Sequence, residues 1–167
     1  MATSKKASAP AKSAVENQEN RTEEVRHVIN RYSAYSFGVG FVPIPVIDMI
    51  GLAALQLNMI KDLHSIHAPE SKFKDEAGKS AISALFGTIA PQSIASGTIG
   101  SAVKGVPVIG GIIGMATFPA FAAASTRALG LIFSKHFADG GGVVDFNPKN
   151  YVEEYKAAFK KAKNNKE

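Results

Sequence analysis

Apolar and polar residues follow each other with helical periodicity over most of the chain, and the strongest strand-like stretch is only residues 142–146. The pattern predicts amphipathic helices over residues 23–35 and 149–163 and a longer helix from residue 45 to about residue 67. A further helix begins near residue 72, and an apolar, Ala-rich helix covers residues 112–137. The expected fold class is therefore all-α, a helical bundle.

Local signals fix several of these helix ends. Pro45 suits the first position of a helix, and Asp48 lies in its first turn, where the helix macrodipole favours an acid. Asn147 followed by Pro148 reads as an N-cap and a first helical residue. Gly87 and Pro91 are expected to kink or break the helix that begins near residue 72.

The centre of the chain is almost free of charge. Residues 80–103 and 105–126 contain no charged side chain, and Lys104 alone separates them. Each stretch is about the 20 residues that a helix needs to cross a bilayer. With a turn at residues 104–107, they predict a Gly/Ala-rich apolar helical hairpin. The sequence leaves open whether this hairpin is inserted in a membrane or buried in a packed helical core.

Small residues recur about every fourth position through this hairpin. Such spacing gives a smooth face on which helix backbones can approach closely, either in lipid or in a soluble core. We define the small-residue stripe, a predicted packing and self-association surface, as Ser93, Gly97, Ser101, Gly105, Gly110 and Gly114.

Charge is concentrated in the flanking regions and gives a net charge of +5. Residues 1–20 are rich in Ala, Ser and Lys and predict a disordered basic arm, which is not a secretory signal. Residues 21–141 form the helical domain, and residues 142–167 a basic amphipathic C-terminal helix. Basic residues flanking the hairpin place both of its ends in the cytoplasm if it is inserted. The arm lacks aromatic residues that would stack on bases, so nucleic acid is not an expected partner.

No arrangement of residues predicts catalysis. The chain has no cysteine, and Gly78-Lys79-Ser80 lacks the earlier glycine of a phosphate-binding loop. His64 and His67 are read as a solvated helix end rather than as metal ligands, and His136 has no acid or nucleophile evident near it. We therefore expect neither an enzyme nor a cofactor or metal site.

Two segments together resemble a known family. Residues 41–63 contain a Pro-x-Pro, an acid three residues later and a glutamine eight residues after that acid, and residues 97–141 contain a Gly-rich turn and a Thr-x-Ala-Leu-Gly motif. They resemble the bacterial domain of unknown function found beside Era-like GTPase domains and in YcjF-like inner-membrane proteins, with the similarity spanning residues 24–141. The family-motif residues are Pro43, Pro45, Asp48 and Gln56.

The resemblance implies a helical module at the cytoplasmic face of the bacterial inner membrane that works with a GTPase. This chain carries no GTPase domain, so the GTPase would be a separate partner. The expected function is a non-enzymatic, membrane-associated, self-associating module. The alternatives are a soluble, cytoplasmic scaffold or adaptor that forms a homo-oligomer, and a membrane-permeabilising or vesicle-shaping protein.

Overall fold

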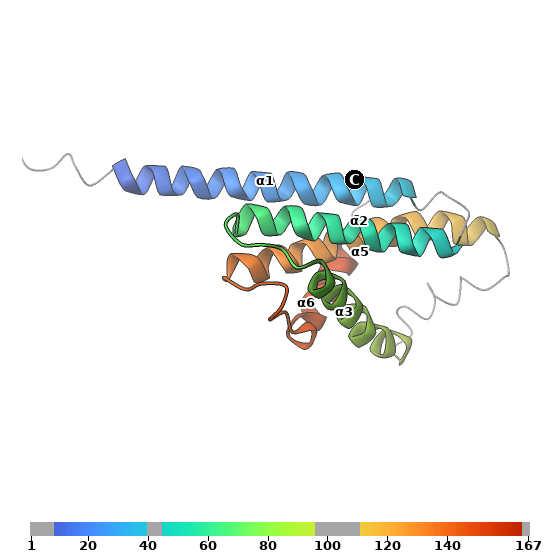
Figure 1. Ribbon diagram of the computed structural model, residues 1–167. Coiled ribbons are helices and arrows are strands. Elements are labelled where there is room, and N and C mark those ends of the chain that lie inside the picture. The colour runs from blue at the N-terminus through green and yellow to red at the C-terminus, as the bar shows by residue number, and fades with distance from the viewer. Residues whose placement is uncertain (1–8, 40–44, 96–110, 165–167) are drawn as a thin grey trace, which may run out of the picture.

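The computed structural model describes the backbone of residues 9–39, 45–95 and 111–164, and the side chains of residues 13–39, 50–87 and 118–164. This part of the chain is all-α, as predicted (Figure 1). It contains five α-helices, and a short 3-10 helix, η1, precedes the last of them. The helices are α1 (Ala9–Val39), α2 (Pro45–His67), α3 (Asp75–Ala95), α5 (Gly111–Ala138) and α6 (Val152–Asn164), with η1 at Pro148–Tyr151.

The long helices α1, α2 and α5 pack against one another lengthwise. Figure 1 shows α1 and α2 side by side, with the N-terminal part of α1 projecting beyond the bundle. Gly130 of α5 marks a close approach, because a Cβ atom at this position would lie 2.9 Å from Ile29 Cγ1 and 3.1 Å from Met59 Sδ. A side chain there would push α5 away from both neighbours.

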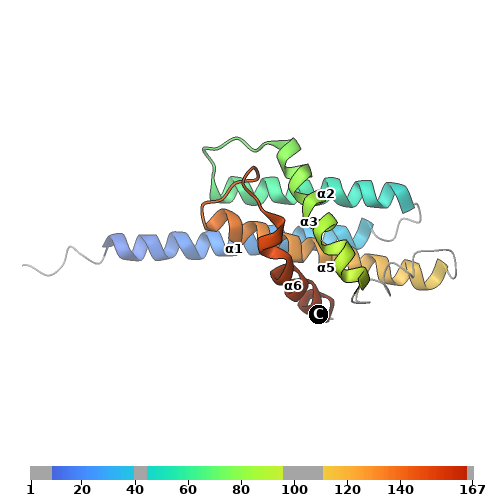
Figure 2. The same ribbon diagram turned by 90° about the horizontal axis from the view of Figure 1, so that it is seen from below.

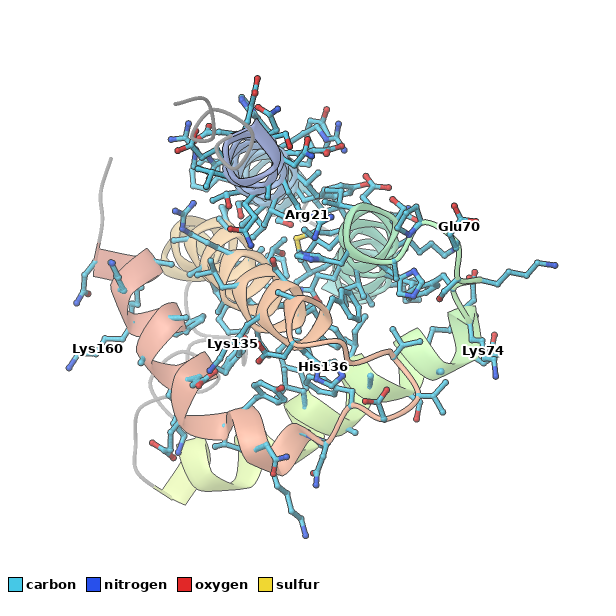
Figure 3. All side chains as sticks on the ribbon, turned by 90° about the vertical axis from the view of Figure 1, so that its left-hand side faces the viewer. Arg21, Glu70, Lys74, Lys135, His136 and Lys160 are labelled. Atoms are coloured by element: carbon cyan, nitrogen blue, oxygen red, sulfur yellow. The ribbon has the colours of Figure 1, made fainter. Side chains whose placement is uncertain are left out.

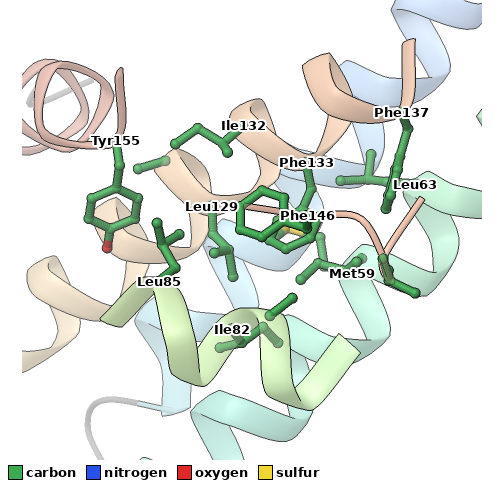
Figure 4. Close-up of a cluster of buried hydrophobic side chains, with 14 of the residues drawn as sticks. Met59, Leu63, Ile82, Leu85, Leu129, Ile132, Phe133, Phe137, Phe146 and Tyr155 are labelled. Atoms are coloured by element: carbon green, nitrogen blue, oxygen red, sulfur yellow. The ribbon is translucent and has the colours of Figure 1, made fainter. Parts of the chain in front are cut away.

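The two shorter helices cover the other side of α5 and α2. Helix α3 packs on α2 and η1, and α6 crosses α5 (Figure 2). The apolar core lies where these helices meet (Figure 4). It contains Phe133, which stacks on Phe146 with ring centroids 4.3 Å apart, and the fully buried residues Met59, Leu85 and Leu129.

The ends of the helices follow local sequence. The N-cap and first-residue prediction at Asn147 and Pro148 is confirmed, since the Asn147 side chain accepts a hydrogen bond from the Lys149 amide. Gly140 has a φ of +86°, a conformation that suits glycine, and it follows the end of α5. The Gly141 amide donates to the His136 carbonyl and the Gly140 amide to the Phe137 carbonyl, which together form a Schellman cap.

Residues 9–20 of the expected disordered arm are helical in the structure, in which α1 begins at Ala9, and residues 1–8 lie outside the described residues. Residues 13–24 of α1 are exposed, so packing does not explain this part of the helix. Its Ala, Glu, Lys and Gln residues have high intrinsic helix propensity, and this local preference accounts for the extension.

Of the two expected effects of Gly87 and Pro91, a kink or a break, the break is wrong, because α3 continues through both residues to Ala95. The turn predicted at Lys104 lies outside the described residues. Within the described residues, α3 and α5, the helices before and after this turn, do not pack lengthwise against each other as a hairpin would. Instead, α5 packs chiefly on α1, α2 and α6.

A membrane-spanning segment was searched for among the described residues only. None of the helices in this part of the chain combines the length and the hydropathy that crossing a membrane requires.

Phe133 and Leu131 test the position of the core. Phe133→Ala removes a fully buried ring and should lower the free energy of unfolding by about 3–5 kcal/mol. Leu131 is on the same helix but 45% exposed, so Leu131→Ala should change it by only about 0.5 kcal/mol or less. Urea titration followed by circular dichroism measures both, and equal losses would contradict this placement of the core.

Candidate functional site

The fold gathers uncharged segments from four helices into one half of the bundle. In sequence, residues 32–60 and 80–126 contain only two charged residues, Asp48 and Lys104. In space, the end of α1, the start of α2, the end of α3 and the start of α5 lie toward the same side, at the right in Figures 1 and 2. We call these helix segments, residues 32–39, 45–60, 80–95 and 111–126, the low-charge half.

Hydrogen-bonded charged and polar groups lie at the border of the low-charge half. Asp62 of α2 accepts from Arg31 Nη2 at 2.8 Å and from the Tyr32 hydroxyl at 2.9 Å. Arg127 donates to Asn30 Oδ1 at 2.6 Å. Arg31, Asp62 and Arg127 are thus tied to neighbouring helices close to the low-charge half, and the transition from uncharged to charged surface falls at a similar level on α1, α2 and α5.

The Lys61 ammonium makes the corresponding link between α2 and α3, since it lies 2.6 Å from Asp75 Oδ2. Both side chains are partly exposed, so this pair contributes little stability. The pair instead marks a contact, in which the start of α3 lies beside α2 at the border between the low-charge half and the charged side of the bundle.

A buried polar network joins four helices inside the low-charge half and at its edge. The Ser36 hydroxyl of α1 lies 2.7 Å from Thr126 Oγ1 of α5, and Gln56 Nε2 of α2 donates to Thr126 Oγ1 at 3.2 Å and more weakly to Ser125 Oγ at 3.4 Å. Ser125 Oγ in turn lies 3.0 Å from the Tyr155 hydroxyl of α6. All five side chains are buried.

The chemistry of this buried polar network is structural. Burial raises the pKa of Tyr155 to about 12, so its phenol keeps its proton and remains a hydrogen-bond donor. Amide and hydroxyl groups alone supply neither a base nor an activated nucleophile. The buried polar network therefore favours the observed arrangement of α1, α2, α5 and α6, because a shift that separated these partners would leave buried hydrogen-bonding groups unpaired.

The histidines are placed differently from the sequence interpretation. His64 is 5% exposed rather than solvated, and its ring lies edge-on to Phe73 and Phe137. Its Nε2 is 3.1 Å from Ser71 Oγ, and His67 Nε2 is 3.1 Å from Ser134 Oγ. Desolvation lowers the pKa of both imidazoles, with nearby Arg21 adding to the effect at His67.

His136 also has polar neighbours that its sequence surroundings do not reveal. Its Nδ1 is 3.0 Å from the Tyr151 hydroxyl, its Nε2 is 2.9 Å from the Gly142 carbonyl, and Asp145 Oδ2 is 3.7 Å from Nε2. The turn after α5 brings these groups back over the ring. Among the residues that the structure describes, no three His, Cys, Asp or Glu side chains form a group that could hold a metal ion.

Of the predicted site residues, the structure describes the side chain of Gln56 alone. Pro45 begins α2 as expected, while the side chains of Pro45, Asp48, Ser93 and Gly114 belong to helical segments whose side chains are not described. The remaining members of the two sets lie outside the described residues: Pro43, Gly97, Ser101, Gly105 and Gly110.

Sequence reasoning did not identify Ser36, Ser125 and Tyr155 as members of the buried polar network that contains Gln56. The signal in the sequence was the pair of segments that resemble the family, residues 41–63 and 97–141. Gln56 belongs to the first segment, and Thr126 begins the Thr-x-Ala-Leu-Gly motif of the second. In space these two residues are joined by a hydrogen bond, and Gly130 of the same motif allows the close approach to α1 and α2.

Comparison with known proteins identifies the class. Residues 5–163 match the family model described as Domain of unknown function (DUF697). Because the match covers most of the chain, the protein belongs to this family. It extends beyond residues 24–141, where the resemblance was expected, and includes α6, which packs on α5.

The chain is also similar to a named protein. The chain is 28% identical over 137 residues to magnetosome membrane protein 22 of Magnetospirillum gryphiswaldense, an alignment that covers 82% of this chain and 69% of that protein. No solved structure matches the chain.

Gln56→Leu tests the buried polar network. The substitution keeps the volume roughly constant but leaves the Thr126 and Ser125 hydroxyls without their amide donor, so the free energy of unfolding should fall by about 1–3 kcal/mol. Asn58→Leu, at an exposed position of the same helix, serves as the control and should stay within about 0.5 kcal/mol. A Gln56→Leu variant as stable as the wild type would show that the hydrogen bonds do not hold the helices together.

His64 should make stability depend on pH. Its pKa in the folded protein is below the ordinary 6.5, so below pH 6.5 the unfolded chain binds more protons at this site. The stabilising contribution is complete above pH 6.5 and is lost as the pH falls through the folded-state pKa. Unfolding titrations from pH 7.5 to about pH 5 should show a smaller loss of stability for His64→Gln than for the wild type. His27→Gln, at an exposed site, should match the wild type, and an unchanged slope in His64→Gln would refute the assignment.

Proposed function

We propose that this protein is a non-enzymatic, membrane-associated helical module that contacts lipid through the low-charge half. The observation that carries the proposal is the folding together of four nearly uncharged helix segments at one side of a bundle whose other side holds the charges. The name of the similar magnetosome membrane protein supports a membrane location.

The dimensions favour contact with one leaflet. Residues 111–126 of α5 and residues 45–60 of α2 would each be about 24 Å long at 1.5 Å per residue. This length is greater than one leaflet of a hydrocarbon core that is about 30 Å thick but less than the whole core. A module of this kind enters the headgroup and upper acyl region with the tip of the low-charge half.

Exposed apolar side chains are present where the proposal needs them. In the low-charge half, Tyr35 is 55% exposed and Ile50 is 66% exposed. Single exposed apolar residues are ordinary on soluble proteins. Here, no charged side chain interrupts the segments that carry them apart from Asp48.

The family resemblance extends the proposal to partners. A separate GTPase and further copies of this chain are the proposed partners, and the inner membrane, on its cytoplasmic face, is the proposed location. The small-residue stripe is the proposed surface for self-association. Gly110→Leu combined with Gly114→Leu should abolish a cross-linkable oligomer in detergent, and an unchanged oligomer would remove the small-residue stripe from the proposal.

A pair of matched substitutions tests membrane contact. Ile50→Glu places an acid in the low-charge half, where entry into lipid disfavours charge, and should weaken binding to liposomes about tenfold or more. Val144→Glu is the control, because Val144 is 68% exposed, like Ile50, but lies in the turn after α5. Liposome flotation measures both variants.

Equal binding of the two variants would contradict contact through the low-charge half. Failure of the wild-type protein to float with any liposome would favour the alternative of a scaffold that works away from membranes.

A further inference from the structure

Helix α6 separates its charges along its length. Its first turn carries Glu153 and Glu154, and its last turns carry Lys160, Lys161 and Lys163. The acids are already paired, because Glu153 accepts from Lys156 at 2.9 Å and Glu154 pairs with Lys135 of α5. The three lysines are exposed and have no ion-pair partner within the part of the chain that the structure describes.

The direction of α6 brings these lysines beside the low-charge half. The Tyr155 hydroxyl reaches Ser125, and one turn later the Phe159 ring packs on Phe121 with centroids 5.6 Å apart. Phe121 also stacks on Phe118, which lies deeper in the low-charge half. The lysines follow Phe159 directly, and Figure 3 shows Lys160 pointing away from the bundle.

The apolar face of α6 is not free to lie on a membrane by itself. Val152 and Tyr155 are buried, and Ala158 and Phe159 are partly buried against the core. The bundle therefore uses the face by which an isolated amphipathic helix would bind lipid, and leaves the lysines as the part of α6 that can reach a surface.

We propose that Lys160, Lys161 and Lys163 bind the phosphate groups of anionic lipids when the low-charge half enters a leaflet. This inference rests on the proposed function and adds the class of lipid. Lysines next to partly buried aromatic rings can extend their charged ends to headgroups while their stems stay against apolar surface. The net charge of +5 adds a long-range attraction of the same sign.

The same lysines also complement the macrodipole at the end of α6, which is a structural role. Removing their charge could thus loosen the helix without any connection to lipid. The test therefore needs a second measurement on each variant, the thermal unfolding transition, and a control that removes the same number of positive charges elsewhere.

The test variant is Lys160→Gln, Lys161→Gln and Lys163→Gln together. The control is Lys72→Gln, Lys74→Gln and Lys149→Gln, which removes three exposed lysines outside α6 and the low-charge half. Flotation of the full chain is measured with neutral phosphatidylcholine liposomes and with liposomes that contain roughly one-third phosphatidylserine.

The wild type should bind the anionic liposomes more strongly, and the test variant should lose roughly 100-fold in partition coefficient on them. Its binding to neutral liposomes and its unfolding midpoint should stay unchanged, and the control should lose much less. At about 1 M salt, where the Debye length is about 3 Å, the difference between wild type and test variant should disappear.

Equal losses in test and control variants would overturn the inference, because net charge alone would then explain the binding. Equal binding of the wild type to neutral and anionic liposomes would also overturn it, while leaving the proposed function in place. Binding to neither kind of liposome would overturn both the inference and the proposed function. Both would also be overturned if an oligonucleotide released the protein from anionic liposomes at a phosphate concentration lower than that of the lipid.

Discussion

Helix α5 determines the arrangement of the other helices, because it packs against α1, α2 and α6 at the same time. Gly130 lets α1 and α2 approach, since a Cβ atom there would collide with Ile29 and Met59, and the aromatic residues of α5 pack on the turn after α5 and on α6. The buried polar network adds direction to this packing. Apolar contacts alone would tolerate a rotated or shifted helix, whereas such a movement would separate the hydroxyls of Ser125 and Thr126 from their buried hydrogen-bond partners.

The separation of charge follows from that arrangement. In Figure 1, α1 and α3 run toward the right and α2 and α5 toward the left, so the uncharged ends of α1 and α3 and the uncharged starts of α2 and α5 come to the same side of the bundle. Arg31, Asp62 and Arg127 then mark the border through bonds to neighbouring helices. A fold in which one of these helices ran in the opposite direction would move its uncharged segment to the other side of the bundle.

Local sequence predicted what local interactions control. The bounds of α2, from Pro45 to His67, and the cap at Asn147 follow from proline geometry and side-chain capping, which act within a few residues. The path of α3 through Pro91 could not be predicted in this way. The tendency of proline to break a helix acts within a few residues, and it does not include the contacts that the rest of the fold makes with α3.

The site was predicted only in part for a related reason. Gln56 was identified through its place in a motif, but its partners are separated from it by about seventy residues of chain, as the pairs with Ser125 and Thr126 show. The burial of His64 and the polar neighbours of His136 also depend on chain segments that return from elsewhere. No periodicity in the sequence reports such contacts, so the helices were predictable and their meeting points were not.

The most direct test of the account is the depth of the low-charge half in a membrane. The chain has no tryptophan, so a single Ile50→Trp substitution gives a clean fluorescent probe, with Val144→Trp as its counterpart outside the low-charge half. With liposomes that carry brominated acyl chains, the account predicts a blue shift and strong quenching at position 50 and neither at position 144. Equal quenching at both positions, or none at either with bound protein, would contradict it.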